Sequence, residues 1–171
     1  MPKVVIDTNV LLVANQQHDE VSTECVANCI ERLQRIQNTG VVVIDDSFII
    51  LGEYQNKTRI NPPRGVGDVF LKWLLRNMGN PAQVEMVSVT LTATDFYAEF
   101  PDQTLQAEFD PPDRVFPAVA NAHPDKPTIL QAADCKWIDW WPALAEQGVK
   151  VEFLCAADAQ RFHKIKFPRQ R

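Results

Sequence analysis

Acidic side chains are the groups in this sequence most able to do chemistry, and six of them fall near the ends of predicted strands. They are Asp7, Asp45, Asp46, Glu53, Asp113 and Asp134. Carboxylates that gather in one place repel one another, and without a cation some of them would hold a proton. Hard divalent cations such as Mg2+ and Mn2+ take oxygen ligands of this kind. The pattern therefore predicts a carboxylate site for a divalent cation.

The predicted strands indicate why acids so far apart in the sequence could meet. Asp7 directly follows a short apolar run, and Asp134 lies two residues beyond another such run. Asp113 opens the helix that leads into that second run. Glu53 lies about two helical turns after Asp46 and so near the same face. In open α/β sheets, ligands bind at the carboxyl ends of the strands, which is where these acids are expected.

Helix capping is the competing explanation. Aspartate often accepts hydrogen bonds from the first N–H groups of a helix, and Asp46 and Asp113 stand where helices are predicted to begin. Taken singly, each acid is better explained as a cap or a solvated charge than as a ligand. Asp7 is harder to explain in this way because it interrupts a strongly apolar segment. The whole set, in this order, favours the metal site.

Short β-branched runs alternate with helical patterns along the chain. Strands are predicted at 3–6, 41–45, 128–132 and 149–154, with a further strand within 84–92. Helices are predicted at about 20–38, 47–58, 67–78, 113–121 and 137–147. This alternation implies βαβ units, and hence an α/β fold with a mostly parallel central sheet and helices on both faces.

The chain length indicates a single domain over 1–171, because 171 residues can bury a sizeable core. Residues at about 80–112 hold scattered acids and the Pro111-Pro112 pair. They are predicted to form an insertion or a long connection with one helix. The tail at 164–171 is basic and is expected to be loose.

Composition limits the function classes and the compartment. The formal net charge of −5 argues against a generic basic sheath for nucleic acid, but it suits a site built from acids. No stretch is long enough to span a bilayer, and the apolar start is too short for a signal peptide, so we expect a cytoplasmic protein without membrane contact. The four cysteines form no C-x-x-C pair. They are expected to be reduced, buried thiols rather than zinc ligands.

Four segments, taken in order, resemble the PIN-domain family. They are Val4-Val5-Ile6-Asp7-Thr8-Asn9-Val10-Leu11, Leu51-Gly52-Glu53-Tyr54, the segment 113–120 and the segment 129–137. The first motif is fairly specific, whereas the other three are informative only in their order. The chain departs from the family pattern at Lys136, where members often carry a further acid, and at Pro117, inside a predicted helix. The segment before the third motif is also longer than in compact members.

The resemblance implies a three-layer α/β/α PIN-like fold and a metal-dependent nuclease, in particular an endoribonuclease that hydrolyses phosphodiester bonds. Asp7, Asp113 and Asp134 would be the principal ligands of Mg2+ or Mn2+. Glu53 would be the fourth catalytic acid. It would bind the metal directly or through water, or it would orient the attacking water.

The remaining expectations concern positioning residues and partners. Thr8 and Asn9 are expected to hold the carboxylates in place. Lys57, Arg59 and Arg64 follow the Glu53 helix and are candidates for phosphate contacts, with solvated surface charge as the alternative. RNA is the expected substrate, and single-stranded nucleic acid in general is the wider class. Many family members are toxins neutralised by an antitoxin protein, so an antitoxin or a second copy in a homodimer is a candidate partner.

Two other functions stay open at this point. One is a PIN-like module that binds RNA or protein without cutting. The other is a phosphatase of the haloacid dehalogenase type, which also has an aspartate after its first strand. That chemistry usually needs a second acid two residues later, where this chain has Asn9. The tryptophans near 137–141 are expected to pack in the core, and could stack on bases only if exposed.

Overall fold

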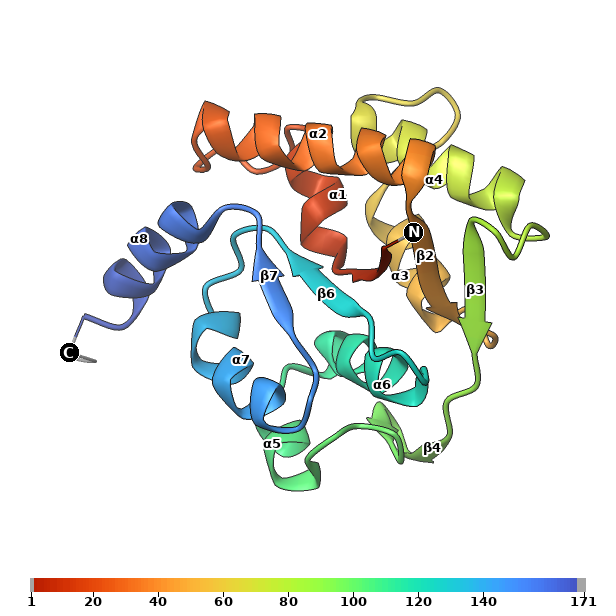
Figure 1. Cartoon of the computed structure of the whole chain (residues 1–171). Helices are drawn as coiled ribbons and strands as arrows, with labels where there is room; N and C mark the ends of the chain where they lie inside the picture. Colours follow the sequence, from red (N-terminus) through yellow and green to blue (C-terminus); the bar gives the residue numbers. More distant parts are fainter. Residues whose placement is uncertain (1, 169–171) are drawn as a thin grey trace.

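A five-stranded parallel sheet forms the middle layer of the protein, and helices cover both of its faces (Figure 1). The computed structural model describes residues 2–168. The strands of this sheet are β1 (Lys3–Ile6), β2 (Val41–Asp45), β3 (Val84–Val87), β6 (Thr128–Gln131) and β7 (Val151–Phe153). Their order across the sheet is β3-β2-β1-β6-β7. The predicted three-layer α/β/α fold is confirmed.

The helices divide between the two faces of the sheet. Within the described residues they are α1 (Thr8–Ala14), α2 (Thr23–Thr39), α3 (Ile49–Lys57), α4 (Val66–Asn77), α5 (Gln103–Glu108), the 3-10 helix η1 (Pro111–Asp113), α6 (Val115–Ala122), α7 (Trp137–Glu146) and α8 (Ala156–Lys166). Helices α1, α2 and α4 pack together on one face, and α6 and α7 lie on the other (Figure 1). None of the helices in this part of the chain combines the length and the apolar character needed to cross a membrane.

The central strands β1, β2 and β6 are almost wholly buried. Strands covered on both faces need apolar side chains on both, which is why β1 and β2 are mostly β-branched runs without alternation, and why β6 is apolar up to Gln131. Because all five strands run parallel, their carboxyl ends lie at one edge of the sheet. The backbone N–H of Asp7 continues the β1–β6 pairing by donating to the carbonyl of Leu130 at 2.9 Å. Asp7 is therefore fixed at that edge.

The segment at 80–112 contains strands of both sheets and a short helix. Its first part is β3, an edge strand of the main sheet. Strands β4 (Leu91–Ala93) and β5 (Phe96–Tyr97) then form a small antiparallel pair, and α5 supplies the single helix that was expected. Buried Gln106 bonds both the N–H and the carbonyl of Tyr97, and buried Arg114 donates to the carbonyl of Gln106. Polar contacts thus join this segment to the start of α6.

Two further differences lie in helices. Pro117 was expected to distort its helix, yet α6 runs unbroken from Val115 because Pro117 lies in its first turn, where an N–H has no partner inside the helix. Helix α8 was not predicted, and its last residues include the start of the tail expected to be loose. Residues 169–171 of that tail lie outside the described residues.

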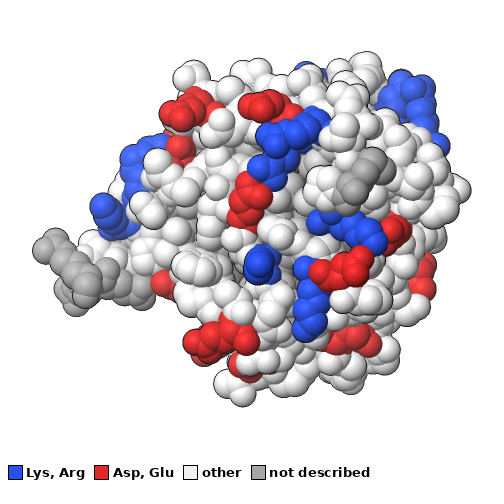
Figure 2. All heavy atoms as spheres, in the orientation of Figure 1, with Lys and Arg blue, Asp and Glu red and all other residues white. Residues whose placement is uncertain are grey.

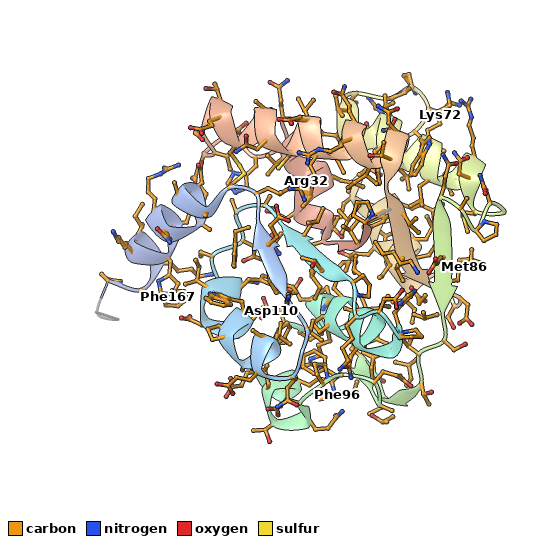
Figure 3. All side chains as sticks on the ribbon, in the orientation of Figure 1. Arg32, Lys72, Met86, Phe96, Asp110 and Phe167 are labelled. Carbon is orange, nitrogen blue, oxygen red and sulfur yellow. A yellow bond between two sulfur atoms is a disulfide. The ribbon has the colours of Figure 1, made fainter. Side chains whose placement is uncertain are left out.

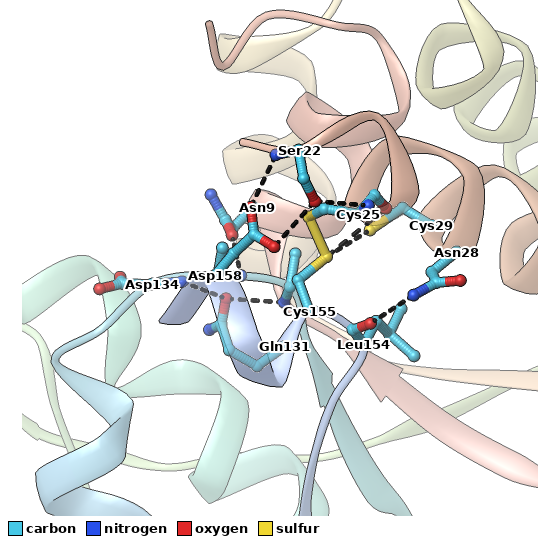
Figure 4. Close-up of a disulfide and its surroundings, with 12 residues drawn as sticks. Asn9, Ser22, Cys25, Asn28, Cys29, Gln131, Asp134, Leu154, Cys155 and Asp158 are labelled. Atoms are coloured by element: carbon cyan, nitrogen blue, oxygen red, sulfur yellow. Dashed lines mark hydrogen bonds between the residues drawn. A yellow bond between two sulfur atoms is a disulfide. The ribbon is translucent and has the colours of Figure 1, made fainter. Parts of the chain in front are cut away.

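The cysteine prediction is wrong for two of the four thiols. Cys25 on α2 and Cys155 before α8 form a disulfide, whereas Cys29 and Cys135 are free and buried (Figure 4). The sulfur of Cys29 lies 3.8 Å from that of Cys155. The pair joins residues 130 positions apart in the sequence, a separation at which spacing patterns carry no information.

Candidate metal centre

Asp7, Asp113 and Asp134 come together at the carboxyl edge of the sheet. Asp7 follows β1, Asp134 follows β6 after a short turn, and Asp113 ends η1 just before α6. Burial raises the pKa of Asp7 well above its ordinary value, and the charges of Asp113 and Asp134 raise it further. Burial, followed by the charge of Asp134, raises the pKa of Asp113 to about 7. The three carboxyls therefore share one electrostatic environment.

Asp7 is the most buried of these carboxylates and is also the N-cap of α1. Only 3% of the residue is exposed. Its Oδ2 accepts a hydrogen bond of 2.9 Å from the backbone N–H of Asn9. Its buried Oδ1 makes no hydrogen bond of normal geometry to a described residue, although the nearby side chain of Gln131 lowers the pKa of Asp7. A buried carboxylate oxygen without a donor is costly, and a cation would remove that cost.

Asn9 lies where a positioning residue is needed. Besides donating its N–H to Asp7, it accepts a 2.9 Å hydrogen bond at Oδ1 from the N–H of Ala133 (Figure 4). Gln131 accepts from the N–H groups of Ala132 and Asp134, so the turn that carries Asp134 is fixed from two sides. Thr8, expected to do the same work, is buried, but its hydroxyl makes no hydrogen bond to a described residue.

Lys136 inserts a positive charge among the acids. Its Nζ lies 3.9 Å from an oxygen of Asp113 and 3.9 Å from an oxygen of Asp134, and it forms an ion pair with Asp110. Asp110 is the residue directly before η1, and Figure 3 labels it. The ammonium offsets part of the negative charge, and it lowers the pKa of Asp113 against the upward effect of burial. Sequence analysis missed the pairing of Asp110 with Lys136.

Glu53 lies on α3 beside Asp113. Its charge contributes to the raised pKa of Asp113, although less than the charges of Asp134 and Asp110 do. It also lines a small cavity of about 170 Å³ with Asp95 and Tyr97. Glu53 therefore lies near the three aspartates, on the side of the acidic region that α3 forms.

The carboxylates do not close around a common point in this structure. Among the described residues, the one trio of potential ligand atoms within 4.8 Å of each other consists of the sulfurs of Cys25, Cys29 and Cys155. Like charges keep carboxylates apart unless a cation lies between them. A metal held by Asp7, Asp113 and Asp134 would require the acids to move inward and Lys136 to move aside. The buried, unpaired Oδ1 of Asp7 fits such a ligand set.

The other strand-end aspartates have structural partners. Asp45 accepts hydrogen bonds from the N–H groups of Ile49 and Ile50 and so caps α3. Asp46 accepts from the hydroxyl of Ser88, and Asp139 pairs with His163 at 2.9 Å. These three aspartates therefore have roles outside the acidic centre.

The three predicted phosphate contacts differ in their surroundings. Arg64 pairs with buried Asp68 at 3.1 Å, so its charge is already engaged. Lys57 and Arg59 are exposed at and beyond the end of α3. Of the tryptophans, Trp137 and Trp140 are buried, as expected for core residues, and Trp141 is 41% exposed.

A groove of about 700 Å³ opens next to Asp134. Asn9 and Asp134 line the end that adjoins the acids, and α8 contributes Arg161, Phe162 and Lys166. Sequence analysis missed these three residues because it did not predict α8. The only signal for them was the density of basic residues near the end of the chain.

Comparison of the chain with protein family models, with curated proteins and with solved structures gives no match. The function must therefore be argued from the site and from the order of its motifs.

Proposed function

We propose that this protein is a metal-dependent nuclease, specifically an endoribonuclease that hydrolyses phosphodiester bonds with Mg2+ or Mn2+. The observation that carries the proposal is the buried Asp7 oxygen, which lacks any hydrogen-bond partner within residues 2–168. Burial and the charges of nearby carboxyls raise the pKa values of Asp7 and of its neighbour Asp113. A buried oxygen without a donor destabilises the folded protein, and a bound hard cation would remove that cost.

Asp7, Asp113 and Asp134 would hold the metal, and Glu53 would hold it through water or orient the attacking water. A bound divalent cation supplies a hydroxide at neutral pH and offsets charge on the phosphate. The protein's own contribution is positional. Asn9 and Gln131 fix Asp7 and the turn of Asp134 by hydrogen bonds. Lys136 would be free to contact the phosphate once it leaves the carboxylates.

The resemblance of the four motifs to PIN domains supports RNA as the substrate. A cytoplasmic location fits an RNA substrate. The resemblance also supports an antitoxin protein or a second copy of the chain as a partner. A phosphatase of the haloacid dehalogenase type is a weaker candidate, because Asn9 is engaged with Ala133 at the position where that chemistry needs an acid.

The test is cleavage of RNA and of single-stranded DNA by the purified protein, with Mn2+ and with chelator. Wild-type protein should cut RNA only with the metal, and Asp7→Asn should lose most of that cleavage while remaining folded. Asp46→Asn is the matched control, because Asp46 is exposed and accepts a hydrogen bond from the hydroxyl of Ser88. A protein that melts cooperatively yet never cuts either polymer would be a non-catalytic binding module instead.

A further inference from the structure

The groove beside Asp134 leads away from the candidate metal centre. Its volume of about 700 Å³ lies within the range of sites that hold small ligands or single nucleotides. One end is formed by Asn9 and Asp134, and one wall is formed by Phe162, Ile165 and Lys166 of α8. A polymer cut at the acids must continue on either side of the cut bond, and this groove offers one such path.

The α8 wall is basic although the chain as a whole is acidic. Helix α8 carries Arg161, His163, Lys164 and Lys166, in a protein with a formal net charge of −5. Its one acid, Asp158, is 7% exposed and bonds the N-terminus of α2. Figure 2 shows basic surface over this helix. A cationic surface next to an acidic metal centre suits a ligand with repeated negative charges.

The same groove also contains planar side chains of the kind on which bases stack. The rings of His18 and Phe162 are stacked, with centroids 5.5 Å apart and planes 20° from parallel. The guanidinium of Arg161 lies 4.6 Å from the centroid of Phe162. Ile165, at the rim, is 72% exposed. Proteins that bind single strands combine cations that follow the backbone with aromatic rings on which bases stack.

The α8 wall of the groove is fixed to the rest of the protein, although few residues of α8 are buried. Only Asp158 and Ala159 of this helix are buried. The Cys25–Cys155 disulfide fixes its start, and Asp158 accepts hydrogen bonds from the N–H and hydroxyl of Ser22 at 2.7 and 2.9 Å (Figure 4). His163 then ties its far half to α7 through Asp139. A wall fixed before binding reduces the entropy cost of ordering a ligand.

We propose that this groove binds a single-stranded polynucleotide next to the bond that is cut, with a base stacked on the His18–Phe162 pair and the backbone phosphates on Arg161 and Lys166. The inference rests on the proposed function for its choice of RNA. The groove itself recognises the chemistry shared by single-stranded RNA and DNA, namely unpaired bases on a charged backbone.

The test measures binding rather than cleavage. A short fluorescent single-stranded RNA is titrated with the protein in chelator, and its anisotropy is followed at several salt concentrations. Phe162→Leu keeps an apolar side chain but removes the ring, and should weaken binding roughly tenfold, whereas Phe162→Trp should preserve it. Lys166→Ala should weaken binding and lower the salt slope by about one.

Lys150→Ala is the matched control. Lys150 lies in a separate pocket of about 510 Å³ that it shares with Lys3 and Gly148, at the start of β7 and so at the opposite edge of the sheet. Its removal should leave RNA affinity unchanged. Asp7→Asn should also still bind RNA through the groove, even though it is expected not to cut.

The outcomes separate the groove from the nuclease activity. If wild-type protein cuts RNA while Phe162→Leu and Lys166→Ala bind it like wild type, the groove assignment is overturned and the nuclease stands. If no cleavage occurs but binding depends on Phe162 and Lys166, the groove stands without the nuclease. Single-stranded DNA of the same sequence should bind with comparable affinity, because the groove recognises chemistry that the two polymers share, and equally tight binding of a duplex would overturn the assignment to single strands. Binding to phosphatidylserine vesicles that depends on Lys166, with no RNA binding, would make α8 a membrane contact.

Discussion

Two buried aspartates of this protein lie in opposite surroundings. Asp68, on α4, is fully buried and accepts hydrogen bonds from Asn15 Nδ2, from the N–H of Arg59, and from both the N–H and the side chain of Arg64. Asp7 is nearly as buried, yet it accepts one hydrogen bond, and its second oxygen has no partner in the described part of the chain.

The pKa values of the two groups follow from this difference. Burial opposes ionisation of Asp68, but the hydrogen bonds from Arg59, Arg64 and Asn15 outweigh it and lower its pKa below the ordinary value. Burial and the neighbouring charges of Asp113 and Asp134 raise the pKa of Asp7. A buried carboxylate surrounded by hydrogen-bond donors stabilises the fold. A buried carboxylate surrounded by other acids has the properties expected of a metal ligand.

Removing Asp68 should have the largest effect on stability. Asp68→Ala leaves Asn15 and Arg64 without their common partner, and should lower the free energy of unfolding by about 3–5 kcal/mol. Urea denaturation measures this loss. Asp46→Ala is the control, because Asp46 is exposed and, within residues 2–168, accepts a hydrogen bond only from Ser88, so a change near zero is expected. A loss for Asp68→Ala as small as that of the control would show that its hydrogen bonds contribute little.

The pH dependence of stability should distinguish the acidic centre from the Asp68 network. A carboxyl with a raised pKa keeps its proton in the folded protein, so its stabilising effect is present at low pH and is lost as pH rises through the folded pKa. With the pKa of Asp113 at about 7 against an ordinary value of 3.8, the metal-free protein should lose stability between about pH 4 and pH 7, roughly 2 kcal/mol of it above about pH 5.5. Asp113→Asn should flatten this dependence in denaturation curves. An equal slope in the variant would mean that Asp113 titrates normally.

Lys136 offers a smaller and more selective test. Its ammonium lies where it would compete with a metal for Asp113 and Asp134. Lys136→Met removes one nearby positive charge from a partly exposed site, so Mn2+ affinity should rise roughly fivefold. Calorimetric titration of both proteins measures the change. Weaker binding by the variant would indicate that Lys136 arranges the acids for the metal instead of competing with it.

The sequence was most informative where structure is local. The strands at β1, β2 and β6 were predicted because buried parallel strands need unbroken apolar runs, and the edge that gathers the acids follows from parallel topology alone. The helix start after β2 was equally local, although the cap is Asp45, whose partners Ile49 and Ile50 lie within the next turn, and not Asp46 as predicted.

The features that sequence analysis missed depend on contacts between distant residues. Lys136 meets Asp110 across 26 positions, and Cys25 meets Cys155 across 130. Helix α8 gave no apolar periodicity because it buries only Asp158 and Ala159 and is held by polar and covalent contacts at its ends. The groove was not predicted either, because α8 forms one of its walls.

The central claim is that Asp7 is a ligand while comparable acids serve the fold, and Mn2+ binding measured by calorimetry tests it most directly. Wild-type protein and Asp139→Asn should bind Mn2+ alike, whereas Asp7→Asn should bind at least about tenfold more weakly. Without metal, Asp7→Asn should melt no lower than wild type, because a buried carboxyl crowded by like charges has been removed. Equal Mn2+ affinity in wild type and Asp7→Asn would contradict the claim, as would a metal-free Asp7→Asn that no longer folds.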